Sequence, residues 1–221
     1  MKKILFIFIC LLFFDKVIIY AETATYKRCK VNFVDEAQKD NSFFKFRIEL
    51  LEHIEKKDVQ YLLSITDKNI IYSFGDDDGI KGFVDEWKIF EKDSKVWDVL
   101  KEVINSGGRF EGEDIFFAPY TFTEFLDDYD VFEYNIVKGE NRKVYLKPDR
   151  NSYVLGILSN EVIKINNETE EKIPETWSLV TLYNGKKGYI LSRYLKSPID
   201  FRVGFIKKKG VWKMNCFVEG D

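Results

Sequence analysis

The chain has 221 residues, 45% of them hydrophobic and 16% aromatic, with only 4 prolines. This length allows one large or two small folded domains, and this composition excludes a disordered or low-complexity chain. Lys and Arg (34) nearly balance Asp and Glu (37), so the chain lacks the basic excess typical of nucleic-acid-binding proteins.

Residues 1–21 have the pattern of a secretory signal peptide. Lys2 and Lys3 precede an apolar run from Ile4 to Phe14, and Ala21 is a small residue suited to cleavage. The run is shorter than the roughly 20 apolar residues that cross a bilayer. We therefore expect an exported protein, periplasmic or extracellular, with no membrane attachment after cleavage. An uncleaved N-terminal anchor is the alternative.

Two cysteines, Cys29 and Cys216, lie beyond the expected cleavage point. In an oxidising compartment such a pair is a candidate disulfide. The alternative is two separate thiols, with Cys216 buried as a small hydrophobic side chain.

The amino-terminal half is predicted to be an α+β domain over residues 42–135, preceded by a connecting arm over 22–41. Ser42 is a candidate N-cap for the first helix, and Gly107-Gly108 is a candidate C-cap for the last one. The expected helices cover 42–57, 58–65, 83–90 and 94–106, and the expected strands cover 69–74 and 110–122.

From residue 131 onward the chain is almost entirely strand-like. Short strands separated by Gly, Asn and Asp are typical of a small barrel or sandwich, so we expect an all-β unit over 136–198. The expected strands cover 131–137, 143–146, 153–158, 162–165, 179–183 and 188–191.

Residues 199–221 are predicted to form a closing hairpin with strands over 201–206 and 211–218. Alternation places four side chains on one apolar face of its second strand: Trp212, Met214, Cys216 and Val218. That face needs a cover, so we expect the hairpin to return to the amino-terminal sheet. A Cys29–Cys216 bridge would be consistent with that return.

The segment from Trp177 to Leu195 carries the most specific pattern in the chain. A strand opens at Trp177, a hairpin with Gly185 and the run Gly188-Tyr189-Ile190 follows, and Ser192-x-Tyr194-Leu195 closes it. Asn184-Gly185 is a hairpin turn signal, because glycine tolerates a positive φ. With two earlier strands, this pattern resembles a bacterial SH3 (SH3b) domain over about residues 142–195. Tyr145, Lys147 and the acidic loop over 166–175 depart from the family's usual form.

This resemblance implies a small SH3-like barrel that binds a ligand and does not catalyse a reaction. The family's ligands are cell-wall (peptidoglycan) peptides, bound by exposed aromatic residues between loops. The matching candidates for ligand binding are Tyr145, Trp177, Tyr189 and Tyr194. The alternative is that these rings close the core of the barrel.

The order of elements in the amino-terminal half, with its closing hairpin, is faintly similar to NTF2-like folds. Such folds enclose a pocket within a curved sheet. The alternative function is therefore a small-molecule-binding pocket with the SH3b-like unit as scaffold.

No motif for an enzymatic reaction occurs in the chain, and no metal or cofactor is expected. His53 is the one histidine, so a multi-histidine zinc site is excluded, and a place on a helix surface is expected. The run Asp76–Gly79 fails the calcium-loop pattern because Trp87 occupies its twelfth position. The two catalytic carboxylates of a glycosidase are identified by their distance in the fold and not by their spacing in the sequence. The sequence therefore does not exclude such a pair among Glu111, Glu113 and Asp114.

The leading hypothesis is a non-catalytic exported protein whose SH3b-like unit contacts cell-wall peptides or a protein partner.

Overall fold

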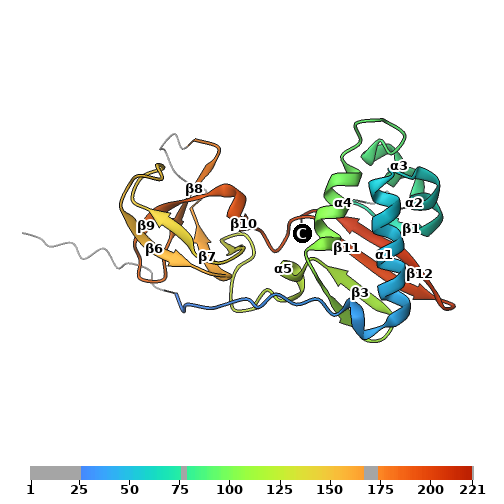
Figure 1. Cartoon of the computed structure of the whole chain (residues 1–221), viewed down its shortest axis with the longest axis horizontal. Coiled ribbons are helices and arrows are strands. Elements are labelled where there is room, and N and C mark those ends of the chain that lie inside the picture. The colour runs from blue at the N-terminus through green and yellow to red at the C-terminus, as the bar shows by residue number, and fades with distance from the viewer. Residues whose placement is uncertain (1–25, 76–78, 167–173, 221) are drawn as a thin grey trace, which may run out of the picture.

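The computed structural model describes residues 26–75, 79–166 and 174–220. The expected signal peptide, the Asp76–Asp78 part of the calcium-like run and most of the acidic loop lie outside the described residues. Two lobes lie side by side (Figure 1). The first lobe comprises residues 37–123 and 202–218, and the second lobe comprises 134–196. Among the described helices, none is long and apolar enough to cross a bilayer.

The first lobe is built on a five-stranded sheet in the order β1-β12-β11-β3-β2. Its strands are β1 (Thr66–Ile71), β2 (Arg109–Glu111), β3 (Ile115–Ala118), β11 (Arg202–Lys208) and β12 (Val211–Val218). β12 pairs with β1 in parallel, and β11 pairs with β3 in antiparallel fashion. The closing hairpin therefore returns to the amino-terminal sheet, as predicted, and occupies its centre.

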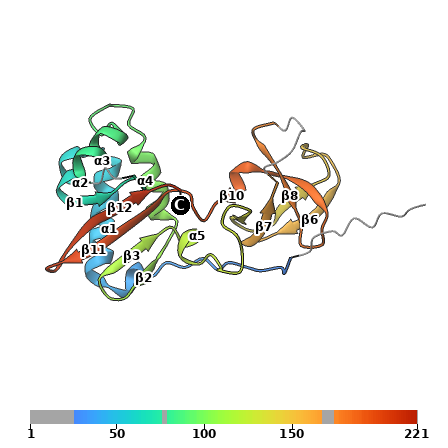
Figure 2. The same cartoon turned by 180° about the vertical axis from the view of Figure 1, so that it is seen from behind.

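Helices cover one face of this sheet, and Figure 2 shows strands β3, β11 and β12 in front of α1 when the molecule is seen from behind. The helices are η1 (Ala37–Lys39), α1 (Asn41–Glu55), α2 (Val59–Ile65), α3 (Ile80–Trp87), α4 (Val96–Asn105) and α5 (Tyr120–Thr123). The core centres on Phe43 of α1, whose ring lies 4.2 Å from Phe116, 4.9 Å from Trp212 and 5.6 Å from Phe205. This aromatic cluster joins the helix layer to three strands of the sheet.

The second lobe is a seven-stranded antiparallel sheet in the order β10-β4-β7-β8-β9-β5-β6. Its elements are β4 (Tyr134–Val137), β5 (Arg142–Tyr145), β6 (Val154–Leu158), β7 (Glu161–Ile165), β8 (Trp177–Thr181), β9 (Lys187–Leu191), η2 (Ser192–Tyr194) and β10 (Leu195–Lys196). Val144, Ile163, Val180 and Ile190 are fully buried in its core. The chain is thus α+β with two sheets. The pairings leave this strand order open, so the closed SH3-like barrel stays a prediction.

The arm (residues 26–36) runs along both lobes (Figure 1). Lys30 forms an antiparallel bridge with Glu161 of β7, and Asp35 forms a parallel bridge with Gly108, the residue before β2. Between these bridges, Val31 is buried in a cluster with Tyr120, Ile136 and Val162. One small apolar core therefore contains residues from the arm and from both lobes.

Several element bounds differ from the sequence prediction. The N-cap of α1 is Asp40, not Ser42, because its carboxylate accepts hydrogen bonds from the amides of Ser42 (2.6 Å) and Phe43 (2.9 Å). The strand predicted over 69–74 begins at Thr66 and ends at Ile71. The single strand predicted over 110–122 is a hairpin, turned at Gly112 with φ +71°, and is followed by α5.

A β-bulge overturns the predicted face of the last strand. Gly204 pairs with Cys216 and Phe205 with Met214, so Asn215 is an extra residue in β12. Such a residue reverses the alternation that follows it. Phe217 joins Trp212 and Met214 in the core, and Cys216 lies outside that cluster.

The predicted disulfide is not formed. Cys29 lies in the arm, where its carbonyl accepts a hydrogen bond from the Val162 amide (3.0 Å), while Cys216 lies on β12 of the first sheet. A disulfide requires Cα atoms within about 7 Å, and the two cysteines are held on different lobes. Of the alternative, two separate thiols with Cys216 buried, only the burial is wrong, because Cys216 is partly exposed.

Candidate functional site

Three of the four predicted binding residues gather on neighbouring strands of the second sheet. Tyr145 of β5 pairs directly with Tyr189 of β9, and Leu179 of β8 pairs with Tyr189 from the other side. Their strand neighbours Val144, Val180 and Ile190 point into the core, so alternation turns these side chains outward. Trp177 lies two residues before Leu179 and therefore faces the same way.

We call Tyr145, Trp177 and Tyr189 the ring surface. The rings of Tyr145 and Trp177 meet edge to face, with centroids 5.6 Å apart and planes at 86°. All three residues are only partly buried. They are therefore neither fully buried nor fully exposed, and both a ligand-binding role and a role in closing the barrel stay predictions.

Two glycines explain how the sequence brings these strands together. Gly185 turns the β8–β9 hairpin with φ +79°. A Cβ on Gly188 would lie 2.8 Å from the carbonyl oxygen of Tyr145 and 2.7 Å from Leu155 Cδ1. Only glycine therefore lets β9 approach β5 closely enough to place Tyr189 beside Tyr145.

Tyr194, the fourth candidate, has different neighbours. Its ring lies under the guanidinium of Arg142 (4.2 Å) and near that of Arg193 (5.0 Å), and it packs against the core of the second lobe. A hydrogen bond from Arg193 lowers the pKa of its phenol below the ordinary value. Tyr194 therefore packs with Arg142 and Arg193 and is not part of the ring surface.

A polar pocket of about 380 Å³ adjoins the ring surface at Trp177. Asn135, Asn166, Ser178 and Ser192 line it with amide and hydroxyl groups, and the Ser178 and Ser192 hydroxyls lie 2.9 Å apart. Asp200 also lines it, and burial raises the pKa of that carboxyl. Sequence reasoning missed this pocket, because its residues come from four separate segments.

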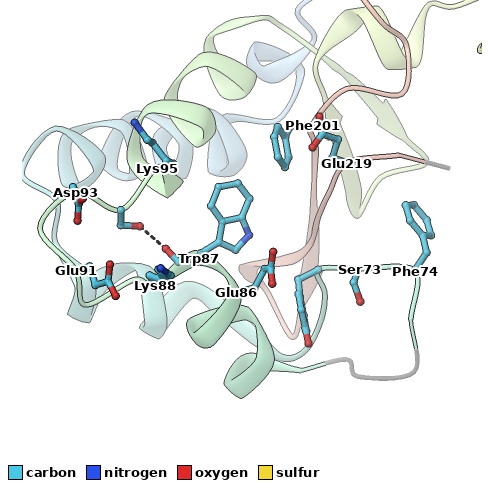
Figure 3. A pocket seen from close by; sticks show the side chains of 12 residues that line it. Ser73, Phe74, Glu86, Trp87, Lys88, Glu91, Asp93, Lys95, Phe201 and Glu219 are labelled. Carbon is cyan, nitrogen blue, oxygen red and sulfur yellow. Dashed lines mark hydrogen bonds between the residues drawn. The ribbon is translucent and has the colours of Figure 1, made fainter.

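A second pocket, of about 560 Å³, lies in the first lobe around Trp87 (Figure 3). Phe201 and Glu219, which come from the other end of the chain, also line it. Two other large aromatic residues of this half, Trp97 and Tyr120, do not line this pocket: Trp97 is in the core, and Tyr120 is in the cluster shared by both lobes.

The residues with catalytic potential are engaged in structural contacts. The ring of His53 is stacked on Tyr61 at 3.8 Å, and its Nδ1 lies 2.8 Å from Asp58 Oδ2. The Tyr61 amide and His53 lower the pKa of Asp58, which also caps α2. Across the described residues, no group of three His, Cys, Asp or Glu side chains is placed to hold a metal ion.

Of the candidate glycosidase carboxylates, Glu113 and Asp114 line a pocket of about 450 Å³ with Glu36 and Asp40, and Glu111 does not. Burial opposes ionisation of Glu36, but bonds from Lys39 and the Phe110 amide prevail and lower its pKa. Bonds from Ser42 and the Phe43 amide lower the pKa of Asp40. A glycosidase acid needs a raised pKa, so neither residue suits that role.

Comparison of the chain with protein-family models, curated proteins and solved structures gives no match.

Proposed function

We propose that this protein is a non-catalytic, exported binding protein whose second lobe binds cell-wall peptides at the ring surface. The observation that carries the proposal is the gathering of Tyr145, Trp177 and Tyr189 on the outward face of β5, β9 and β8. Aromatic side chains supply large contact areas at low entropic cost and are over-represented among binding hot spots.

The polar pocket beside Trp177 complements this surface. A wall peptide carries backbone amides and short aliphatic side chains, so it needs apolar contact together with donors and acceptors. Trp177 belongs to both regions: its ring contacts that of Tyr145, and it lines the pocket together with Ser178 and Ser192. A peptide lying across Trp177 would meet both kinds of contact.

The proposal of a binding protein also agrees with the engagement of its one histidine. A cysteine or serine peptidase needs a histidine close to its nucleophile. Here His53 lies in the first lobe against Tyr61 and Asp58. Export rests on the sequence of residues 1–21.

The test is an NMR titration of residues 22–221 with soluble muropeptides. We expect saturable shifts in the indole signal of Trp177 and in the backbone signals of Tyr145 and Tyr189. Trp177→Ala should weaken binding by at least about tenfold, because it removes the residue shared by the ring surface and the pocket.

Phe90→Ala is the matched control, since Phe90 is also an exposed aromatic residue (69%) but belongs to the first lobe. Binding by this variant should equal that of the original chain. The absence of shifts at millimolar muropeptide would contradict the proposal, and the same surface would then be tested against protein partners.

A further inference from the structure

The pocket of the first lobe has an aromatic floor formed by Trp87 and Phe201, and the buried Phe217 packs against both rings. One face of the Trp87 indole is stacked on the buried Phe217, with centroids 4.7 Å apart and planes at 24°. Phe201 lies 5.2 Å from the same indole. Figure 3 shows Trp87 at the centre of the lining residues, with Glu86 next to it and Phe201 and Glu219 on one side.

The position of Trp87 is fixed by its backbone as well as by its ring. The Ser94 hydroxyl, which is largely buried, donates a hydrogen bond to the Trp87 carbonyl (2.6 Å), shown as a dashed line in Figure 3. Lys88 ends α3 in the left-handed conformation and turns the chain toward α4. The indole is therefore held in place before any ligand arrives.

The rim of this pocket is acidic. Its charged residues are Glu86, Glu91, Asp93 and Glu219 against Lys88 and Lys95. Among the residues that the structure describes, none of these four carboxylates forms an ion pair. Elsewhere in the first lobe an exposed carboxylate does pair with a lysine, as Glu55 does with Lys101. This rim therefore retains negative charge over an aromatic floor.

We propose that this pocket binds an organic cation, with an alkylammonium or quaternary ammonium group on the face of Trp87. An indole face is the strongest aromatic acceptor for such a cation, and burial of the contact strengthens the attraction. Glu86 and Glu219 supply the opposite charge beside it. The volume of about 560 Å³ is in the range of small-molecule sites, so the ligand extends beyond the ammonium group.

The probe is choline, and its neutral isostere 3,3-dimethylbutan-1-ol is the control ligand. The chain has 4 tryptophans, so their four indole N–H signals report separately on different parts of the molecule. Choline should shift the Trp87 signal in a saturable way and leave the Trp177 signal unchanged. The isostere should bind about tenfold more weakly, because it lacks the charge.

Trp87→Leu keeps an apolar side chain but removes the aromatic face. We expect choline affinity to fall about tenfold, read from the backbone amides of Lys88 and Ser94. Trp177→Leu is the matched control and should leave choline affinity unchanged. This control also distinguishes the pocket around Trp87 from the ring surface, so that the organic-cation proposal and the cell-wall-peptide proposal can each fail without the other.

The double variant Glu86→Gln/Glu219→Gln tests the charge without disturbing the aromatic floor. Both residues are exposed, so the fold should persist while choline affinity falls about fivefold. Glu111→Gln, on β2, should have no effect. The proposal is overturned if choline shifts Trp177 and not Trp87, if the isostere binds as tightly as choline, or if the double variant binds choline normally.

Discussion

Arg28 and Glu161 attach the arm to the second lobe. The Glu161 side chain is only 1% exposed and accepts hydrogen bonds from Arg28 Nε (2.5 Å) and Nη2 (2.8 Å) and from the Ser159 amide (3.1 Å). Burial alone would raise the pKa of this carboxyl, but the bonds from Arg28 and Ser159 outweigh it. The folded-state pKa of Glu161 therefore lies below its ordinary value.

We predict that Arg28→Ala lowers the free energy of unfolding of the second lobe by about 2 kcal/mol at pH 7, because it leaves a buried carboxylate without its partner. A lowered folded-state pKa adds stability above the unfolded-state pKa, and that stability is lost on acidification. The difference between variant and original chain should shrink as the pH falls below about 4.3.

Urea denaturation followed by amide signals of the second lobe measures this difference. Lys101→Ala, which breaks the exposed pair with Glu55, is the control and should cost less than about 1 kcal/mol. An equal loss in both variants, or a loss that does not vary with pH, would contradict a role for the buried carboxylate.

At the level of single elements, the close approach of β9 to β5 depends on Gly188. We predict that Gly188→Ala destabilises the second lobe by about 2 kcal/mol, because the new methyl group would overlap the Tyr145 carbonyl and the Leu155 side chain. The displaced β5 should also lose the edge-to-face contact between Tyr145 and Trp177. Thermal unfolding and aromatic NOEs measure the two effects.

Gly156→Ala is a matched glycine-to-alanine change on β6, which pairs with β5 on the side away from β9. There the new methyl group would meet only the Leu182 side chain, at 3.3 Å, so a change within about 1 kcal/mol is expected. If both variants lose stability equally, steric crowding at Gly188 is not the cause.

The sequence predicts most elements, because their signals are local. Apolar periodicity places α1 and α4, and turn residues place the strands of the second lobe. The wrong predictions concern features that depend on the pairing between strands and not on the sequence of one strand. The bulge at Asn215 arises from the pairing of β12 with β11, and without it Cys216 is wrongly assigned to the core.

The candidate site also combines features that have a local sequence signal with features that do not. The SH3b-like pattern selects Tyr145, Trp177 and Tyr189, and strand alternation alone turns them outward together. Contacts between distant segments leave no local signal. Arg202, only 9% exposed, places its guanidinium over the rings of both Phe74 (5.2 Å) and Phe122 (5.0 Å), and no spacing in the sequence predicts that arrangement.

At the scale of the whole molecule, the first lobe depends on the last strands of the chain. We predict that a chain ending at Pro198 loses the fold of the first lobe, because β11 and β12 form the centre of its sheet and bury Phe205, Trp212 and Phe217. The amide spectrum should then retain dispersed signals only for the second lobe.

A chain ending at Val218 keeps both strands and is the control, with dispersed signals expected from both lobes. A first lobe that stays folded in the chain ending at Pro198 would show that its helices and the remaining strands form a stable unit without the hairpin.

The central place of β11 and β12 also fixes an order of events during synthesis. The seven strands of the second lobe are contiguous in the chain and can pair as soon as they leave the ribosome. Helices α1 to α4 emerge earlier, yet their apolar faces stay uncovered until residue 218 is free. During translation, the residues made first therefore cannot complete their core until the last residues have been made. The apolar faces that stay uncovered in that interval are what a chaperone would bind.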